Sequence, residues 1–317
     1  MSLKGFLFPG QGVQSVGMGR DLVASSAAAR EAFEAAERES GLALSRLCFE
    51  GPLEELSRSD VGQVAIVTVS IAALCAMEEA AGRPLRPRAA AGLSLGEYSA
   101  LVAAGALDLC AAVRLVQRRG AYMQEACDAN PGAMYSVIGL EDARVEQACE
   151  AARSQAGGGV WPANYNCPGQ VVISGEEGPT RTAADLCTQA GARRAVRLNV
   201  AGAFHTPLMQ PAADRLANDL AALEIRKPHY PVIANVTGQP VDEPEEIRRL
   251  LARQVTSPVR WLDSMKWLLA QGVRECYEIG PGRVLQGLLK RTDPSCACAT
   301  VSDAADVQAW AEKAADV

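Results

Sequence analysis

The segment AAAGLSLGE, residues 89–97, constrains the fold more than any other stretch of this 317-residue chain. Small apolar residues lead into a G-x-S-x-G pattern, and a helical pattern follows it. This is typical of a nucleophile elbow, in which a serine lies on a sharp turn between a strand and a helix. We therefore expect an α/β fold in which Ser94 is lifted clear of the end of a sheet strand.

Strand and helix patterns alternate along most of the chain, which favours a mostly parallel sheet. The apolar segment 61–80 predicts a central helix that is buried nearly all round. The other elements expected outside the middle of the chain are strands at 3–10, 88–92, 231–236 and 273–279, helices within 96–127 and at 207–224, 244–255 and 261–271, and a final helix after Gly282.

The segment 131–199 has a different character. Its pattern predicts strands at 133–140, 158–166, 169–175 and 193–200, and helices at 141–154 and 179–192. The resulting β-α-β-β-α-β order is the ferredoxin-like signature. We therefore expect a larger domain, residues 1–130 and 200–317, that is interrupted by a small inserted domain at 131–199.

Charge and hydropathy exclude several classes of function. Lysine and arginine number 31 against 37 aspartate and glutamate, a net charge of −6, which argues against nucleic-acid binding. The sequence has no run of about 18 apolar residues, so it predicts no membrane span, and the N-terminus does not resemble a signal peptide. The ten cysteines are scattered in apolar stretches, so we expect reduced thiols in a cytoplasmic protein and no metal site.

A serine is a weak nucleophile until a base accepts its proton. The chain has only two histidines. His229 lies between prolines in RKPHYP and is expected on the surface. His205 lies in NVAGAFHTPLM, where a strand ends and a helix begins, so we predict that Ser94 is the nucleophile and His205 the base. A carbonyl near Asn235 or Gln254 could orient the histidine, and the sequence leaves that choice open.

Two further segments suggest contacts with a ligand. The glycines of PGQG, residues 9–12, let the backbone approach a ligand closely. Arg119, in QRRGAYMQEA, could hold a carboxylate through two parallel hydrogen bonds. The alternatives are an ordinary turn at residues 9–12 and a surface charge at Arg119, next to Arg118.

Six motifs occur in order: FPGQG, GLSLGEYSALVAAG, RRGAYMQEA, NYNCPGQVVISG, GAFH and YEIGPGRVL. In these, the chain resembles the malonyl-CoA:acyl carrier protein transacylases of fatty acid synthesis, and it is similar to the acyltransferase domains of polyketide synthases. The resemblance implies a hydrolase-like α/β domain with an inserted ferredoxin-like subdomain. It also implies ping-pong transfer of malonyl from malonyl-CoA to the phosphopantetheine thiol of acyl carrier protein, through a malonyl-serine ester, by a monomer without bound cofactor or metal.

The resemblance assigns expected roles to individual residues. The backbone N–H groups of Gln11 and Leu95 would form the oxyanion hole, and Arg119 would pair with the malonyl carboxylate. The other expected roles are a carbonyl of Gln254 that orients His205, Phe204 filling the space of an α-methyl group, and Asn164 and Asn166 on the cofactor side of the cleft.

Leu93 departs from the family pattern, which usually has a histidine before the serine. A leucine cannot donate a hydrogen bond to the acyl group, so the rate or the affinity could differ. Because acyl carrier proteins are acidic, a local basic patch is needed for docking, and the candidates are Arg193, Arg194, Lys290 and Arg291. Two alternative functions are a serine esterase or thioesterase that passes the acyl group to water, and a non-catalytic module that docks a carrier protein.

Overall fold

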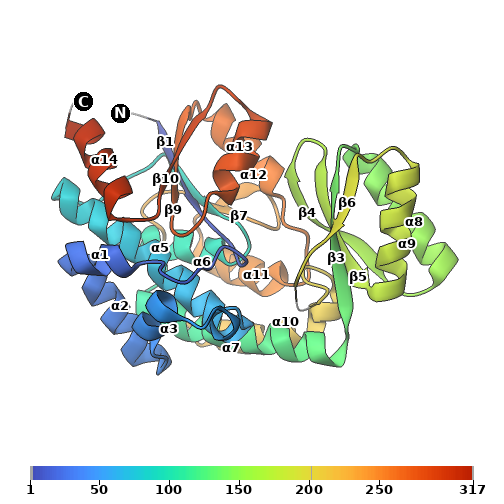
Figure 1. Cartoon of the computed structure of the whole chain (residues 1–317), viewed down its shortest axis with the longest axis horizontal. Helices are drawn as coiled ribbons and strands as arrows, with labels where there is room; N and C mark the ends of the chain where they lie inside the picture. The colour runs from blue at the N-terminus through green and yellow to red at the C-terminus, as the bar shows by residue number, and fades with distance from the viewer. Residues whose placement is uncertain (1–2, 201, 316–317) are drawn as a thin grey trace.

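The computed structural model describes residues 3–200 and 202–315 (Figure 1). It has a mixed α/β architecture with one mostly parallel sheet and one antiparallel sheet. This confirms the predicted class at that level of detail. Both ends of the predicted larger domain, residues 1–2 and 316–317, and residue 201 lie outside the described part.

The larger sheet has six strands in the order β10-β9-β1-β2-β7-β8. All neighbouring pairs are parallel except β7 and β8, which pair antiparallel at one edge. The strands β1 and β2 at its centre are buried and lead into the PGQG turn and the serine elbow. The strands are β1 (Lys4–Phe8), β2 (Ala89–Gly92), β7 (Val232–Ala234), β8 (Gln239–Val241), β9 (Glu275–Ile279) and β10 (Ala297–Val301).

Helices surround this sheet (Figure 1). A short 3-10 turn, η1 (Pro207–Met209), leads into α10. The helices are α1 (Arg20–Ser25), α2 (Ala27–Ser40), α3 (Leu44–Glu50), α4 (Leu53–Leu56), α5 (Ser59–Ala81), α6 (Gly96–Ala103), α7 (Leu109–Ala129), α10 (Gln210–Ala221), α11 (Pro244–Gln254), α12 (Trp261–Ala270), α13 (Val284–Thr292) and α14 (Ala304–Ala315).

Helix α5 is the predicted central helix, and the prediction that it is buried nearly all round is confirmed. Within the described residues it is the one helix long and apolar enough to cross a membrane. However, 89% of its most apolar window is buried inside the protein. Its apolar character therefore serves packing between α2, α7 and the sheet.

The antiparallel sheet is built from one continuous stretch of chain. Its strands have the order β4-β5-β3-β6, and two helices and a separate apolar core accompany them. Figure 1 shows this unit at one end of the molecule. The elements are β3 (Gly132–Ile138), α8 (Asp142–Ala156), β4 (Val160–Cys167), β5 (Gln170–Glu176), α9 (Glu177–Gln189) and β6 (Arg194–Arg197).

The backbone of β4 joins the smaller sheet to a loop of the larger part of the protein. The N–H of Tyr165 donates to the carbonyl of Val259 at 2.9 Å, and the N–H of Val259 donates to the carbonyl of Ala163 at 2.8 Å. Val259 lies between α11 and α12. These bonds place β4, which carries Asn164 and Asn166, against the larger part of the protein.

Two strands were missed by the sequence patterns, and the expected final helix after Gly282 is not the last element. Helix α13 is followed by β10 and α14. Strands β8 and β10 lie at the two edges of the larger sheet and are partly exposed. Edge strands bury little apolar surface, and β8 also contains a proline. β10 consists mostly of small residues, so neither strand has the alternating or β-branched pattern by which strands are recognised.

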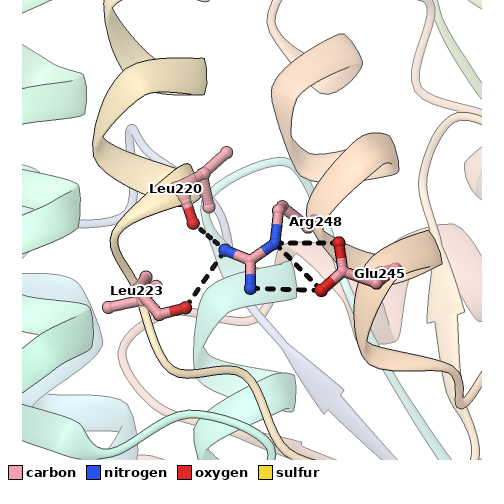
Figure 2. A network of polar contacts seen from close by, with 4 residues as sticks. All are labelled: Leu220, Leu223, Glu245 and Arg248. Atoms are coloured by element: carbon pink, nitrogen blue, oxygen red, sulfur yellow. Dashed lines mark hydrogen bonds and ion pairs between the residues drawn. The ribbon is translucent and has the colours of Figure 1, made fainter.

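Arg248 of α11 fixes the end of α10 (Figure 2). Its guanidinium donates to the carbonyl oxygens of Leu220 and Leu223 and also binds the carboxylate of Glu245, with Nε 3.3 Å from Oε2. Leu220 lies in the last turn of α10 and Leu223 just beyond it, so Arg248 binds carbonyls at the C-terminal end of this helix. Because α10 begins just after His205 and α11 ends at Gln254, the contact holds together the two helices that flank those residues.

Candidate active site

Ser94 lies on the sharp turn between β2 and α6, with a backbone φ of 52°. A Cβ atom at Gly92 would lie 1.9 Å from the carbonyl of Gly96. A Cβ atom at Gly96 would lie 2.1 Å from the carbonyl oxygen of Phe8. Only glycine fits at either position, which is the physical reason for the two glycines of the G-x-S-x-G pattern.

Asn235, directly after β7, holds this turn in place. Its side-chain Oδ1 accepts a hydrogen bond from the backbone N–H of Ser94 at 2.6 Å, and its Nδ2 donates to the carbonyl of Gly92 at 2.7 Å. A positive φ is unfavourable for serine, so the turn needs such support. Asn235 was one of two candidates for orienting the histidine. In the structure its side chain binds the backbone of Ser94 instead.

His205 lies beside the serine. Its Nε2 is 2.9 Å from Ser94 Oγ, and its Nδ1 is 3.0 Å from the backbone carbonyl of Gln254. A carbonyl oxygen only accepts, so Nδ1 carries the proton and Nε2 offers its lone pair to the serine hydroxyl. Burial, together with the charge of Arg119, lowers the pKa of His205 to about 4. The ring is therefore neutral at physiological pH and can accept a proton.

Backbone strain is concentrated at these two residues. Among the described residues, Ser94 and His205 are the only non-glycine positions with positive φ, at 52° and 61°. Such conformations cost free energy and persist only where surrounding contacts impose them, and they cluster at functional sites. Nothing in the sequence indicated this for His205.

Arg119 of α7 is buried, with 1% of its surface exposed, so the alternative of a surface charge is wrong. Its Nη1 donates to Oε1 of Gln63 at 2.7 Å, and its Nη2 donates to Ser94 Oγ and to Oε1 of Gln254, both at 3.1 Å. All three acceptors are uncharged. The guanidinium therefore has a charge available for an anion next to the serine.

Gln63 was not among the predicted residues. It lies on α5 and is completely buried. Besides accepting from Arg119, it donates from Nε2 to Oε1 of Gln11 at 3.3 Å. The available signal was a single amide within the apolar run 61–67 of the helix, since a buried polar side chain needs partners.

Gln11 lies in the PGQG turn, whose Gly10 lies against Leu93, and Leu95 follows the serine at the start of α6. The Gln11 side chain donates to Oγ of Ser59 at 3.3 Å, so the turn is tied to α5. Within residues 3–200 and 202–315, no hydrogen-bond acceptor is recorded for the backbone N–H of Gln11 or of Leu95. Helix N-termini carry such unpaired donors, and these donors can stabilise an oxyanion.

The remaining predicted residues lie around this centre. Phe204 is buried beside His205, and His229 is exposed as expected. Leu93 is half-buried, and its Cδ2 packs against Gly10. Asn164 and Asn166 are buried on β4, and neither makes a recorded hydrogen bond to Ser94, His205 or Arg119. The four candidate docking residues, Arg193, Arg194, Lys290 and Arg291, are all exposed.

A serine hydroxyl on a strand–helix elbow, a neutral histidine oriented by a carbonyl, and the N–H groups of Gln11 and Leu95 form an arrangement that can carry out acyl transfer. A family model described as acyl transferase domain matches residues 5–312. The chain therefore belongs to the acyl transferase domain family, and it is an acyltransferase.

Individual relatives agree over nearly the whole chain. The protein is 45% identical to the malonyl CoA-acyl carrier protein transacylase of Escherichia coli K12, over 90% of this chain and 91% of that protein. It is 43% identical to the Bacillus subtilis protein of the same name, over 96% of this chain and 94% of that one. The crystal structure of an acyl carrier protein S-malonyltransferase from Vibrio cholerae matches with a TM-score of 0.93 and 43% identity, covering 98% of this chain and all of that one.

Proposed function

We propose that the protein transfers a malonyl group from malonyl-CoA to the phosphopantetheine thiol of acyl carrier protein through a malonyl-serine ester. The observation that carries this proposal is the pair of contacts made by the hydroxyl oxygen of Ser94. Ser94 Oγ lies 2.9 Å from the predicted base, His205 Nε2, and 3.1 Å from a buried guanidinium. Support for the substrates comes from the names of relatives at 43–45% identity, and from a similar chain described as a malonyl-transacylase in complex with its type II polyketide synthase acyl-carrier protein.

In the proposed first half-reaction, Ser94 Oγ attacks the thioester carbon of malonyl-CoA while Nε2 of His205 takes the hydroxyl proton. The N–H groups of Gln11 and Leu95 stabilise the oxyanion of the tetrahedral intermediate. The intermediate collapses when its carbon–sulfur bond breaks, and the sulfur of CoA leaves with the proton from His205. A malonyl-serine ester remains.

In the proposed second half-reaction, the phosphopantetheine thiol gives its proton to His205 and its sulfur attacks the ester carbon. The carbon–oxygen bond to Ser94 breaks, and Oγ recovers the proton from the imidazolium. The carbonyl of Gln254 keeps the ring in the same tautomer in both steps, which allows one histidine to serve as base and then as acid.

Arg119 gives the site its proposed preference for malonyl over acetyl. Its acceptors are amide and hydroxyl oxygens, and a carboxylate is a stronger acceptor for a buried guanidinium than either. Phe204, buried next to the base, would occupy the space of an α-methyl group, and Asn164 and Asn166 would line the cofactor side. The four exposed basic residues remain our candidates for docking the acidic carrier.

Malonyl-CoA alone should release one equivalent of CoA in a burst, after which release should nearly stop. The proposed ester is consumed only by a carrier thiol, so steady turnover requires added holo acyl carrier protein. Stopped-flow detection of free CoA thiol measures both phases. Steady CoA release without carrier protein would instead support the esterase or thioesterase alternative.

Leu93→His should raise kcat/KM for malonyl transfer by about 3- to 10-fold, because the imidazole adds one hydrogen-bond donor beside the acyl group. Steady-state transfer assays with malonyl-CoA measure the effect. Leu93→Met changes the side-chain shape without adding a donor, and it should not reproduce the gain. An unchanged kcat/KM in a folded Leu93→His protein would contradict the view that this leucine limits the reaction.

For the segment 131–199 we propose a ferredoxin-like subdomain inserted into a hydrolase-like domain of residues 1–130 and 200–317. The β-α-β-β-α-β element order and the antiparallel strand order β4-β5-β3-β6 support this. The resemblance also leads us to propose a cytoplasmic monomer that needs no bound cofactor or metal.

A further inference from the structure

Glu97 is a buried carboxylate that the proposed chemical steps do not use. It lies in the first turn of α6 with 2% of its surface exposed. Its Oε2 accepts two hydrogen bonds, from the backbone N–H of Asn235 at 3.0 Å and from Nε2 of Gln254 at 2.8 Å. One donor residue holds the backbone of Ser94 and the other orients His205, so Glu97 contacts both supports of the serine–histidine pair.

The side chain of Gln254 lies between a cation and an anion. Its Oε1 accepts from Arg119 at 3.1 Å, while its Nε2 donates to Glu97 and, at 3.0 Å, to the carbonyl of Ser94. A primary amide has one accepting end and one donating end. The opposite orientation would turn the NH₂ group toward the guanidinium and the oxygen toward the carboxylate. The two charges therefore fix the amide in one orientation.

This arrangement also separates Glu97 from Arg119. A direct ion pair would occupy the guanidinium and compete with an anionic substrate. Here the carboxylate acts through an amide, and the hydrogen-bond acceptors of Arg119 are all uncharged. The negative charge of Glu97 thus partly balances the buried cation and leaves its N–H groups available.

We propose that Glu97 is a positioning residue that acts through Gln254 and Asn235. It fixes the amide that binds Arg119 and the carbonyl that binds His205, and it balances the charge of Arg119 without occupying the guanidinium. This inference rests on the proposed function, because it assigns Glu97 a part in presenting Arg119 to a malonyl carboxylate and His205 to the serine.

The ionisation of Glu97 should be visible in the pH dependence of malonyl transfer. Burial raises the pKa of Glu97 to about 7, against the opposing effects of its two hydrogen bonds and of Arg119, the charged group that faces it from α7. The neighbouring Tyr98 has its pKa raised to about 12 by burial and stays protonated. Malonyl transfer should therefore increase as the pH rises through about 7, where Glu97 becomes charged. The pKa of His205, about 4, is too low to cause this limb.

The test compares Glu97→Gln with the wild type in malonyl transfer from about pH 5 to pH 9. The glutamine keeps the shape and can still accept hydrogen bonds, but it carries no charge and does not titrate. We expect kcat/KM at pH 8 to fall about 10- to 100-fold, and the limb near pH 7 to disappear. Glu97→Asp keeps a titrating carboxylate on a shorter side chain. Its kcat/KM should therefore fall, while its pH profile should still show a limb.

Glu278 offers a matched control. It is also completely buried, burial also raises its pKa, and it also accepts two hydrogen bonds, from the backbone N–H groups of Leu285 at 3.0 Å and Gln286 at 2.8 Å. None of its hydrogen bonds reaches the supports of Ser94 or His205. Glu278→Gln should therefore keep both the pH limb and the rate per folded molecule.

A second readout does not depend on activity. The chain has two histidines, and only His205 is buried with its Nδ1–H hydrogen-bonded to a carbonyl, so a slowly exchanging imidazole N–H resonance in nitrogen-edited NMR spectra belongs to His205. We expect this resonance to shift in Glu97→Gln and to stay in place in Glu278→Gln. A wild-type pH limb retained in Glu97→Gln, or an unmoved His205 resonance, would overturn the inference. A wild type that transfers no malonyl would refute the proposed function instead, and the NMR comparison would still decide the positioning role.

Discussion

Ser94→Ala is expected to lower malonyl transfer by at least about 10,000-fold, because it removes the atom that accepts from Arg119 and lies 2.9 Å from the base. No malonyl adduct should form on the protein. The backbone should be unaffected, since alanine and serine both carry a Cβ at this strained φ and the N–H still donates to Asn235. Intact-protein mass spectrometry after exposure to malonyl-CoA measures the adduct directly.

Ser99 provides the matched control for this substitution. It lies on α6, the helix that follows the elbow, is completely buried, and its Oγ has no hydrogen-bond partner within the described part of the chain. Ser99→Ala should retain both the adduct and the transfer rate. A malonyl adduct on Ser94→Ala at the wild-type rate would refute the serine ester, and unchanged transfer to the carrier would refute the mechanism altogether.

Arg119→Ala is expected to lower kcat/KM for malonyl-CoA by about 30-fold or more, while acetyl transfer falls less or rises. The physical reason is the loss of the charge and the parallel N–H groups that a malonyl carboxylate would use and that acetyl cannot use. The ratio of malonyl to acetyl transfer should therefore drop by a similar factor. Competition assays with the two acyl-CoA esters and one carrier protein measure that ratio.

Two variants separate charge recognition from loss of packing. Arg118, next in sequence, is 60% exposed at its side chain and pairs with Asp219, so Arg118→Ala should keep the wild-type ratio. Arg119→Lys fills most of the space and keeps the charge without the two-pronged geometry, so its ratio should lie between wild type and Arg119→Ala. An unchanged malonyl-to-acetyl ratio in folded Arg119→Ala would show that this arginine does not pair with the carboxylate.

The elbow was predictable because its cause is local. A Cβ at Gly92 would collide with the backbone of Gly96 and Glu97, so this glycine is required by the turn itself, whereas Gly96 is required by the close approach of Phe8 on β1. The position of His205 beside Ser94 was predictable because the chain has so few histidines, and its role as the base stays a prediction. The buried helix α5 was predictable from composition, since a helix that is apolar on every side must be covered on every side.

Edge strands and network partners were not predictable in the same way. Strands β8 and β10 carry little apolar pattern because they cover little of the core. Gln63 and Glu97 looked like ordinary polar residues in helices, and their importance comes only from what lies opposite them.

The sequence by itself determined the strand–helix turn and the alternation of strands and helices, and it identified Ser94 and His205 as the candidate nucleophile and base. These follow from steric limits and hydrophobic periodicity within short stretches of chain. Only the tertiary structure decided which residues surround the serine. Glu97 and Gln254 are separated by 157 positions, and Ser94 and His205 by 111. Such pairs meet because β1, β2 and β7 lie side by side in the sheet and the end of α11 brings Gln254 to the elbow, and no local pattern specifies that strand order.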